Sequence, residues 1–385
     1  MLDFELHNPT RIVFGRDTIR RLPDLVPRGA RILLTFGGGS ILKNGVHAQV
    51  RNALEDFHIE EFGGIEPNPR FETLNKAVAL VRARKIDFLL AVGGGSVVDG
   101  TKYIAAAVHY SGSDPWDILR TAGKGVNTTV PLGVVLTLPA TGSEANGSAV
   151  VSRADTEEKL HFYSPLVYPV FSILDPSTTL TLDARQTGNG VVDAFVHTTE
   201  QYLTVHADSS LQDRFAEGIL STLVEEGPKA LAKPGDQPAR ANIMWSATQA
   251  LFGAMGAGLP GDWAAHGIGH ELTAFYGLDH ARTLAITAPG VWRHQIDRKR
   301  SRLARYGERV WSLSGTEADV ALRAIERTEA FFESMGLPTR LSGYGIDATE
   351  AASRIRARLE ERGSKMGEDG SIGPRDVEAI LLSRA

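Results

Sequence analysis

The feature of this sequence that most restricts its fold is a change in hydrophobic pattern near residue 180. Before that point, short runs of β-branched residues and leucine end in glycine or turn residues, as in 31–36, 88–92 and 132–136. Such runs are typical of strands that are buried on both faces of a parallel sheet. They alternate with stretches of helical period such as 75–84, and this alternation predicts an α/β fold with a doubly wound parallel sheet.

The rest of the chain has a helical pattern instead. Runs rich in alanine, leucine, glutamate and arginine recur at helical period at 213–232, 239–257, 317–335 and 348–362. A turn-forming sequence at 174–178 separates the two patterns. We therefore predict two domains, an α/β domain over residues 1–180 and an all-helical domain over residues 181–385. Two stretches rich in Gly, Ser, Asn and Pro, 63–70 and 111–127, are predicted loops.

Composition excludes several classes of function. The chain has 385 residues, 42% of them hydrophobic and 23% charged, with a formal net charge of −5, and it has no cysteine. Disulfides, thiolate metal sites and cysteine nucleophiles are thereby excluded. The negative charge argues against nucleic-acid or anionic membrane partners. No apolar run is long enough to span a bilayer, and the first residues lack the pattern of a signal peptide, so we expect a cytoplasmic protein.

Two Gly-Gly-Gly-Ser segments, at 37–40 and 93–96, follow predicted strands. A glycine turn that leads into a helix exposes free N–H groups and the positive end of the helix dipole, which favours phosphate binding. Neither segment is the G-x-G-x-x-G fingerprint or the P-loop, so two tight strand–helix turns are the alternative. Their place at the carboxyl ends of neighbouring strands favours a ligand site. A third segment, 137–146, carries small hydroxyl and amide side chains that suit a ribose or carboxamide, or else an N-cap and turn.

Four residues of the second half are spaced as metal ligands. Asp193 and His197 lie four residues apart in a helical stretch, which stacks them on one face. His266 begins a second pair of that spacing, and His280 follows shortly after a glycine. One histidine pair alone would more often be coincidence, but the second pair in the same domain favours a real site. Three imidazoles and a carboxylate suit Fe²⁺, Zn²⁺, Mn²⁺ or Ni²⁺ better than Mg²⁺ or Ca²⁺.

These motifs together resemble a known family. The segments 93–102, 193–197 and 266–280 resemble the signatures of the iron-containing, or group III, alcohol dehydrogenases, and most of all the branch of NADP-dependent butanol dehydrogenases and aldehyde reductases. The likeness extends to about residue 300. It implies a Rossmann-like dinucleotide-binding domain, an all-α metal-binding domain and the architecture of dehydroquinate synthase, with the active site in the cleft.

The resemblance also implies roles for single residues. It assigns the metal, Fe²⁺ or Zn²⁺, to Asp193, His197, His266 and His280. It leaves His270 beside the metal and near the nicotinamide, where we expect it to relay a proton or, alternatively, to orient a metal-bound group. The residues that we expect to bind the dinucleotide are Gly37, Gly38, Gly39, Ser40, Asn68, Gly93, Gly94, Gly95, Ser96, Asp99, Thr137, Leu138, Thr141, Ser143, Asn146 and Lys159.

One position indicates which dinucleotide is used. NAD-using members of the family often carry an aspartate just after the strand that is here predicted to end at Phe36, where it holds the ribose hydroxyls and would repel a 2′-phosphate. This chain has Gly37 to Ser40 there, without a carboxylate. We therefore expect a preference for NADP(H) over NAD(H).

The predicted activity is that of a metal-dependent alcohol dehydrogenase or aldehyde reductase acting on a small or medium alcohol or aldehyde. His161, Phe162 and Trp263 either face the substrate or are plain packing. A homodimer, formed through the edge-like stretch 4–14, is expected from the resemblance. Three alternatives remain: a polyol enzyme like glycerol dehydrogenase, a non-redox lyase like dehydroquinate synthase, and a catalytically silent protein. The lyase would need a cluster of Lys and Arg that the sequence around the metal residues lacks.

Overall fold

The computed structural model describes residues 1–205 and 209–385, which form two compact units. The sheet unit consists of residues 7–182 and 234–248. The helical unit consists of residues 1–6, 183–233 and 249–385.

The sheet unit contains a six-stranded sheet in the order β1-β8-β5-β4-β2-β3, and all of its neighbouring strands run parallel. Its strands are β1 (Arg11–Phe14), β2 (Arg31–Thr35), β3 (His58–Phe62), β4 (Phe88–Gly94), β5 (Leu132–Leu138) and β8 (Phe171–Leu174). The predicted α/β fold with a parallel sheet is confirmed. An antiparallel pair, β6 (Ser148–Arg153) and β7 (Glu158–Tyr163), was not predicted, because its charged residues hide the strand pattern.

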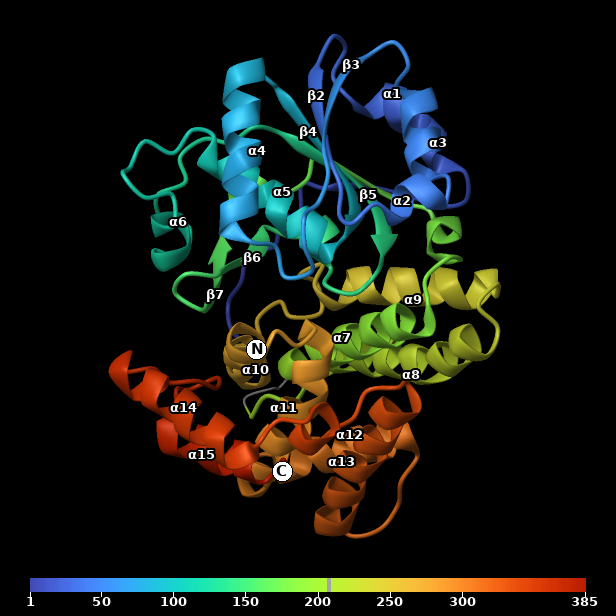
Figure 1. The fold of residues 1–385 in the computed structure, drawn as a ribbon. Coiled ribbons are helices and arrows are strands. Elements are labelled where there is room, and N and C mark those ends of the chain that lie inside the picture. Colours follow the sequence, from blue (N-terminus) through green and yellow to red (C-terminus); the bar gives the residue numbers. More distant parts are fainter. Residues whose placement is uncertain (206–208) are drawn as a thin grey trace. The chain divides into compact units, whose positions relative to one another are not determined.

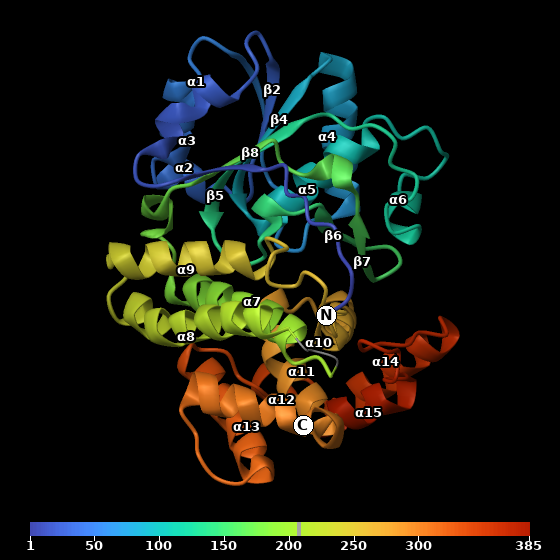
Figure 2. The same cartoon turned by 180° about the vertical axis from the view of Figure 1, so that it is seen from behind.

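Helices cover both faces of this sheet (Figures 1 and 2). On one face α4 (Phe71–Arg84) and α5 (Gly95–Ala107) pack in a core that includes Leu33. On the other face the short helices α1 (Leu22–Leu25), α2 (Ser40–Lys43) and α3 (Val46–Ala53) pack in a second core, which includes Ile32 and Leu34. Successive residues of a strand point to opposite faces, so burial of both faces explains the continuous apolar runs.

The connections of β2 and β4 diverge at the carboxyl edge of the sheet. The helix after β2 packs on one face and the helix after β4 packs on the other, although the two strands are neighbours. This is a topological switch point, the place where open α/β sheets bind ligands. The glycine segments 37–40 and 93–96 and the segment 137–146 follow or end the adjacent strands β2, β4 and β5, so the predicted dinucleotide-binding segments share this edge.

The helical unit is built mostly of helices, as predicted. Its helices are α7 (Ala184–Tyr202), α8 (Ser210–Ala232), α10 (Ala264–Tyr276), α11 (His280–His294), α12 (Ile296–Trp311), α13 (Glu317–Ser334), α14 (Ala348–Glu361) and α15 (Pro374–Leu382). In the part of the chain that the structure describes, no helix combines the length and the apolar character needed to cross a membrane.

Two details of the predicted secondary structure were wrong. The helix predicted over 239–257 is α9 (Gln237–Ala250), and it ends early because glycines with positive φ, at 253 and 258, follow it. The main part of α9 belongs to the sheet unit, where Trp245 contacts Phe14 with ring centroids 5.8 Å apart. The predicted loop 111–127 contains a short helix, α6 (Asp117–Arg120), which the burial of Trp116 and Ile118 anchors.

Candidate functional site

The helix α7 contributes two of the predicted metal ligands. It begins at a capped residue, since the carboxylate of Asp183 accepts the N–H of Gln186 at 2.7 Å. Asp193 and His197 lie one turn apart on its buried face, with only 3% and 4% of their surfaces exposed. Their side chains face each other, the His197 Nε2 atom lying 3.9 Å from Asp193 Oδ1. The spacing predicted from the sequence is therefore realised in a buried environment.

The other two histidines come from α10 and α11, which a short turn connects. Gly277 adopts a left-handed conformation with φ of 67° and ends α10, so that α11 can begin at His280. The helices approach closely at Gly269, where an added Cβ atom would lie 2.7 Å from Thr283 Oγ1. This contact brings the rings of His266 and His280 to a centroid distance of 5.1 Å.

The turn before His280 is attached to α7. The carboxylate of Asp279 accepts hydrogen bonds from Arg185 Nη2 at 2.7 Å and from Asn189 Nδ2 at 2.9 Å. Arg185 and Asn189 lie two turns and one turn before Asp193. The same helix that carries Asp193 thus also fixes the start of α11, which carries His280.

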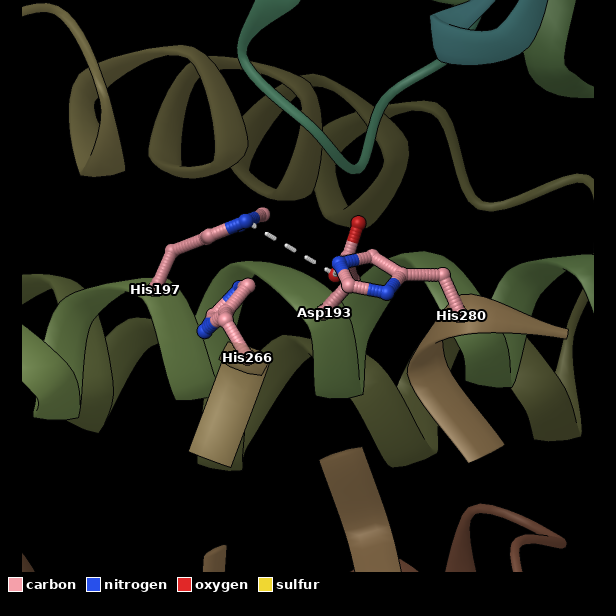
Figure 3. Close-up of side chains that lie close together, drawn as sticks. All are labelled: Asp193, His197, His266 and His280. Carbon is pink, nitrogen blue, oxygen red and sulfur yellow. Dashed lines mark ion pairs between the residues drawn. The ribbon is translucent and has the colours of Figure 1, made fainter. Parts of the chain in front are cut away.

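The four predicted ligands converge (Figure 3). One ligand atom from each of Asp193, His197, His266 and His280 lies within 4.8 Å of all the others. The His280 Nε2 atom is 3.7 Å from Asp193 Oδ1, and the rings of His197 and His266 stack at 4.7 Å. The structure therefore brings together residues that are up to 87 positions apart in the sequence, as a single four-ligand site requires.

The donor set fits a divalent cation. The Nδ1 atom of His266 lies 2.9 Å from the carboxylate of Glu200, which can only accept a hydrogen bond while ionised. This contact favours the tautomer with the hydrogen on Nδ1 and the lone pair on Nε2. That Nε2 atom is buried and has no hydrogen-bond partner among the described residues. A buried, oriented lone pair beside a carboxylate and two more imidazoles is suited to a metal ion.

The other residues predicted near the substrate lie in different environments. His270 lies on α10 one turn after His266, outside the four-residue set, and its ring centroid is 5.4 Å from that of His280. Trp263 precedes α10 and is 38% exposed, with its ring 5.3 Å from that of His266. In the sheet unit, Phe162 is fully buried in the core and His161 is exposed on β7. Phe162 is thus the packing residue that the alternative interpretation described.

Some of the predicted dinucleotide-binding residues of the sheet unit form two hydrogen-bonded groups. In the first, the side chain of Lys159 donates to Asn68 Oδ1 at 2.9 Å, and the backbone N–H of Asn68 donates to Ser96 Oγ at 3.3 Å. Asn68 adopts a left-handed conformation, which asparagine tolerates better than most residues. This group joins the loop before α4 to the start of α5.

The second group contains a residue that the sequence prediction did not assign to the site. The ammonium of Lys102 is fully buried and donates to Ser143 Oγ at 2.9 Å, to Asn146 Oδ1 at 3.1 Å and to the Ser148 carbonyl at 2.8 Å. Ser143 in turn donates to Asp99 Oδ1 at 2.6 Å. These bonds attach α5 to the segment after β5. A lysine three residues after Asp99 in an otherwise apolar helix was the available signal.

The remaining predicted residues lie along the same edge. Gly93 and Gly94 end β4, Thr137 and Leu138 end β5, and Gly37 to Gly39 join β2 to α2, which Ser40 begins. Gly95 permits a close approach, because an added Cβ atom would lie 2.3 Å from the hydroxyl of Thr141. At Gly38 an added Cβ atom would have nothing within 4 Å, so that position is open.

Comparison with known proteins identifies the family. The model for iron-containing alcohol dehydrogenase matches residues 9–176, and that for the C-terminal part of the Fe-containing alcohol dehydrogenase family matches residues 187–381. The NADPH-dependent aldehyde reductase YqhD of Escherichia coli is 55% identical over 375 residues, which cover 97% of both chains. The chain belongs to the iron-containing alcohol dehydrogenase family.

Other relatives and solved structures agree. The NADH-dependent butanol dehydrogenase B of Clostridium acetobutylicum is 38% identical and covers 99% of this chain and 98% of its own. A crystal structure of E. coli YqhD matches with a TM-score of 0.98 at 53% identity, and it covers 100% of this chain and 99% of its own. The NADH-dependent butanol dehydrogenase A of Thermotoga maritima matches with a TM-score of 0.95 at 35% identity and the same coverage.

Membership in the iron-containing alcohol dehydrogenase family confirms that the chain is an oxidoreductase of alcohols and aldehydes. It favours this activity over the lyase and polyol alternatives. The relatives include both NADPH-dependent and NADH-dependent enzymes, so membership alone does not select the dinucleotide.

The buried side chain of Lys102 predicts that the stability of this protein depends on pH. Burial lowers the pKa of Lys102 from 10.5 to about 7, although the charges of Asp99 and Glu144 oppose part of that change. Between these values the unfolded chain binds one proton more than the folded chain, so folding becomes more favourable as pH rises from about 7 to 10.5, and this gain is lost progressively as pH falls back to about 7. Relative to Lys102→Met, the folding constant of the wild type should rise by up to about tenfold per pH unit. Urea unfolding of both proteins at pH 7 to 10 measures this, and a constant difference in unfolding free energy would contradict it.

Proposed function

We propose that this chain is an NADP(H)-dependent aldehyde reductase that interconverts small or medium aldehydes and alcohols with the help of one divalent metal ion, Fe²⁺ or Zn²⁺. Dinucleotide binding is assigned to residues 1–180 and metal binding to residues 181–385. The observation that carries the proposal is the convergence of four ligand atoms within 4.8 Å, one of them an oriented, buried imidazole lone pair. The 55% identity to an NADPH-dependent aldehyde reductase supports the substrate class and the dinucleotide.

The metal would be held by Asp193, His197, His266 and His280. When bound, it supplies a Lewis acid for the oxygen atom of the aldehyde or alcohol. Burial of Asp193, His197 and His266 limits their exchange with water. Arg185 and Asn189 keep the turn at Asp279 fixed, so that His280 meets Asp193 with little reorganisation.

We assign proton movement to His270. Reduction of an aldehyde adds a hydride to carbon and a proton to oxygen, and the dinucleotide supplies the hydride. Imidazole titrates near neutrality and can give that proton up at physiological pH. His270 is half-buried and one turn from His266, so it lies beside the ligand set without belonging to it. The alternative role of His270 is to orient a metal-bound group, and removal of the histidine would then have a different effect.

The dinucleotide would lie along the carboxyl edge of the sheet. The N–H groups that start α5 at Gly95 and Ser96 suit the pyrophosphate, because they carry the positive end of the helix dipole. At the neighbouring segment 37–40 there is no carboxylate to repel a 2′-phosphate. This local absence of negative charge is the reason for proposing NADP(H).

A homodimer and a cytoplasmic location also remain predictions. The strand β1 is at the edge of the sheet and pairs with β8 alone among the described strands. Its other side therefore offers unpaired backbone groups to a strand of a second copy. The predicted stretch 4–14 includes this strand, although regular strand structure is limited to Arg11–Phe14.

Removal of one histidine should distinguish a metal centre from a cluster of packed side chains. We expect His280→Gln to lose the bound metal and nearly all activity, whereas His294→Gln, a histidine that pairs with Asp376, should keep both. Elemental analysis of anaerobically purified protein measures the metal. Metal at a thousandfold excess over Kd should also stabilise the folded wild type by about 4 kcal/mol, which is measured as a higher melting temperature. Equal metal content in the two variants would contradict the proposed site.

The choice of dinucleotide can be tested at Gly38. Because an added Cβ atom there meets nothing and φ is not positive, a side chain fits without strain. We expect Gly38→Asp to lower the ratio of kcat/KM for NADPH to kcat/KM for NADH by roughly tenfold or more, since a carboxylate near a phosphate costs more than 1 kcal/mol where water is partly excluded. Gly38→Asn is the control of equal size without charge. The prediction is wrong if the two variants show the same ratio.

His270→Ala separates the two roles of that histidine. If His270 moves the proton, the variant should retain its metal and bind NADPH normally while kcat falls by about 10²- to 10⁴-fold. Metal content, NADPH affinity and kcat are measured on the same preparation. Loss of the metal would show that the residue supports the metal site instead.

A further inference from the structure

We propose that Glu200 is a positioning residue of the metal centre, which fixes both the orientation and the tautomer of His266. This inference rests on the proposed metal site. Glu200 was not assigned a role from the sequence, and its buried carboxylate makes several hydrogen bonds to α10.

Glu200 lies on the ligand-bearing face of α7. It follows His197 by three residues and Asp193 by seven, which places all three side chains along one stripe of the helix. Only 2% of its surface is exposed. Among residues 1–205 and 209–385, no lysine or arginine lies within ion-pair distance of its carboxylate. The titratable side chain that contacts the carboxylate is that of His266. A buried carboxylate without a cationic side chain is costly unless N–H groups satisfy it.

Those N–H groups come from the first turn of α10. The Oε1 atom of Glu200 accepts the backbone N–H of Ala265 at 3.0 Å, and Oε2 accepts that of His266 at 3.5 Å. The residue before the helix, Trp263, has a left-handed conformation and provides no side-chain cap. Glu200 therefore does from α7 what an N-cap side chain does within a helix. Its negative charge also interacts favourably with the positive end of the α10 dipole. In addition, its own carbonyl accepts the N–H of Asp262 at 2.8 Å.

The same Oε2 atom holds the imidazole of His266 through Nδ1 at 2.9 Å. Because the carboxylate accepts and cannot donate, the ring hydrogen is kept on Nδ1 and the Nε2 lone pair is presented to the other three ligands. Backbone and ring of His266 are thus fixed by one group. A single carboxylate oxygen cannot be replaced by an amide nitrogen without loss of an acceptor, which makes the arrangement testable by an isosteric change.

Glu200→Gln should therefore perturb His266 specifically. Glutamine has one accepting oxygen and one donating nitrogen, so it cannot serve both Ala265 N–H and His266 Nδ1–H. If its amide nitrogen faces the ring, the hydrogen moves to Nε2 and blocks the lone pair. Glu271→Gln is the matched control, because Glu271 is a buried carboxylate on α10 itself but pairs with Arg358 and Arg362 on the other side of the helix.

The experiment uses metal-free full-length protein with ¹⁵N-labelled histidine. Long-range NMR correlations report which ring nitrogen of His266 carries the hydrogen, with the signal assigned by its loss in His266→Gln. We expect hydrogen on Nδ1 in the wild type and in Glu271→Gln, and a shift toward Nε2 in Glu200→Gln. In titrations with Co²⁺ followed by its visible absorption, Glu200→Gln should bind 10- to 100-fold more weakly than the wild type, and Glu271→Gln should bind like it.

The outcomes separate this inference from the proposed function. If the wild type binds no Co²⁺, the metal site itself fails and the inference falls with it. If the wild type binds Co²⁺ and Glu200→Gln binds equally well, the metal site stands and the positioning role is overturned. If Glu200→Gln does not fold, the wild-type spectrum still decides, because hydrogen on Nε2 of metal-free wild-type His266 overturns the inference by itself.

Discussion

Burial of a carboxylate among three imidazoles is the constraint on which the helical unit depends. Asp193 is 3% exposed, and a buried charge of this kind costs several kcal/mol unless it is compensated. Under the proposed function a shared cation supplies that compensation, and sharing it requires His197, His266 and His280 to be close, which fixes how α7, α10 and α11 meet. The surrounding contacts follow from that requirement. Gly269 lets α10 and α11 approach, and Asp279 attaches the turn between them to α7.

The four ligand residues could be predicted from the sequence because helical spacing and residue type are local properties. Asp193 and His197 share a face whatever else the chain does, and the turn at Gly277 is visible as a glycine. Glu200 was missed although it lies on that same face, since its meaning depends on the first turn of a helix 65 residues later. The antiparallel pair β6–β7 and the true end of α9 were missed for a related reason. Charged strand residues and positive-φ glycines make sense only when their neighbours in space are known.

The glycine segments show a similar limit. Their place at the carboxyl ends of β2 and β4 was predictable from the alternation of strands and helices, and so was their suitability for phosphate. What each glycine does was not. Gly95 is required by the side chain of Thr141, which would collide with any Cβ atom there, whereas Gly38 has open space around it. One of two glycines in nearly identical motifs therefore serves packing, and the other leaves room for a ligand or a side chain.

Lys102 and Glu200 illustrate how a buried charge that holds a structure together differs from one that prepares a site. In its ammonium form Lys102 has three donors, and its three acceptors, Ser143, Asn146 and Ser148, all belong to the segment it anchors. Its hydrogen bonding is complete within the protein, so its effect is rigidity. Glu200 likewise satisfies backbone N–H groups, but its bond to His266 Nδ1 leaves the opposite nitrogen of that ring buried without a partner among the described residues. That nitrogen lies beside a carboxylate and two more imidazoles, and this combination, not the presence of charge as such, is why we propose a cation there and not at the network of Lys102.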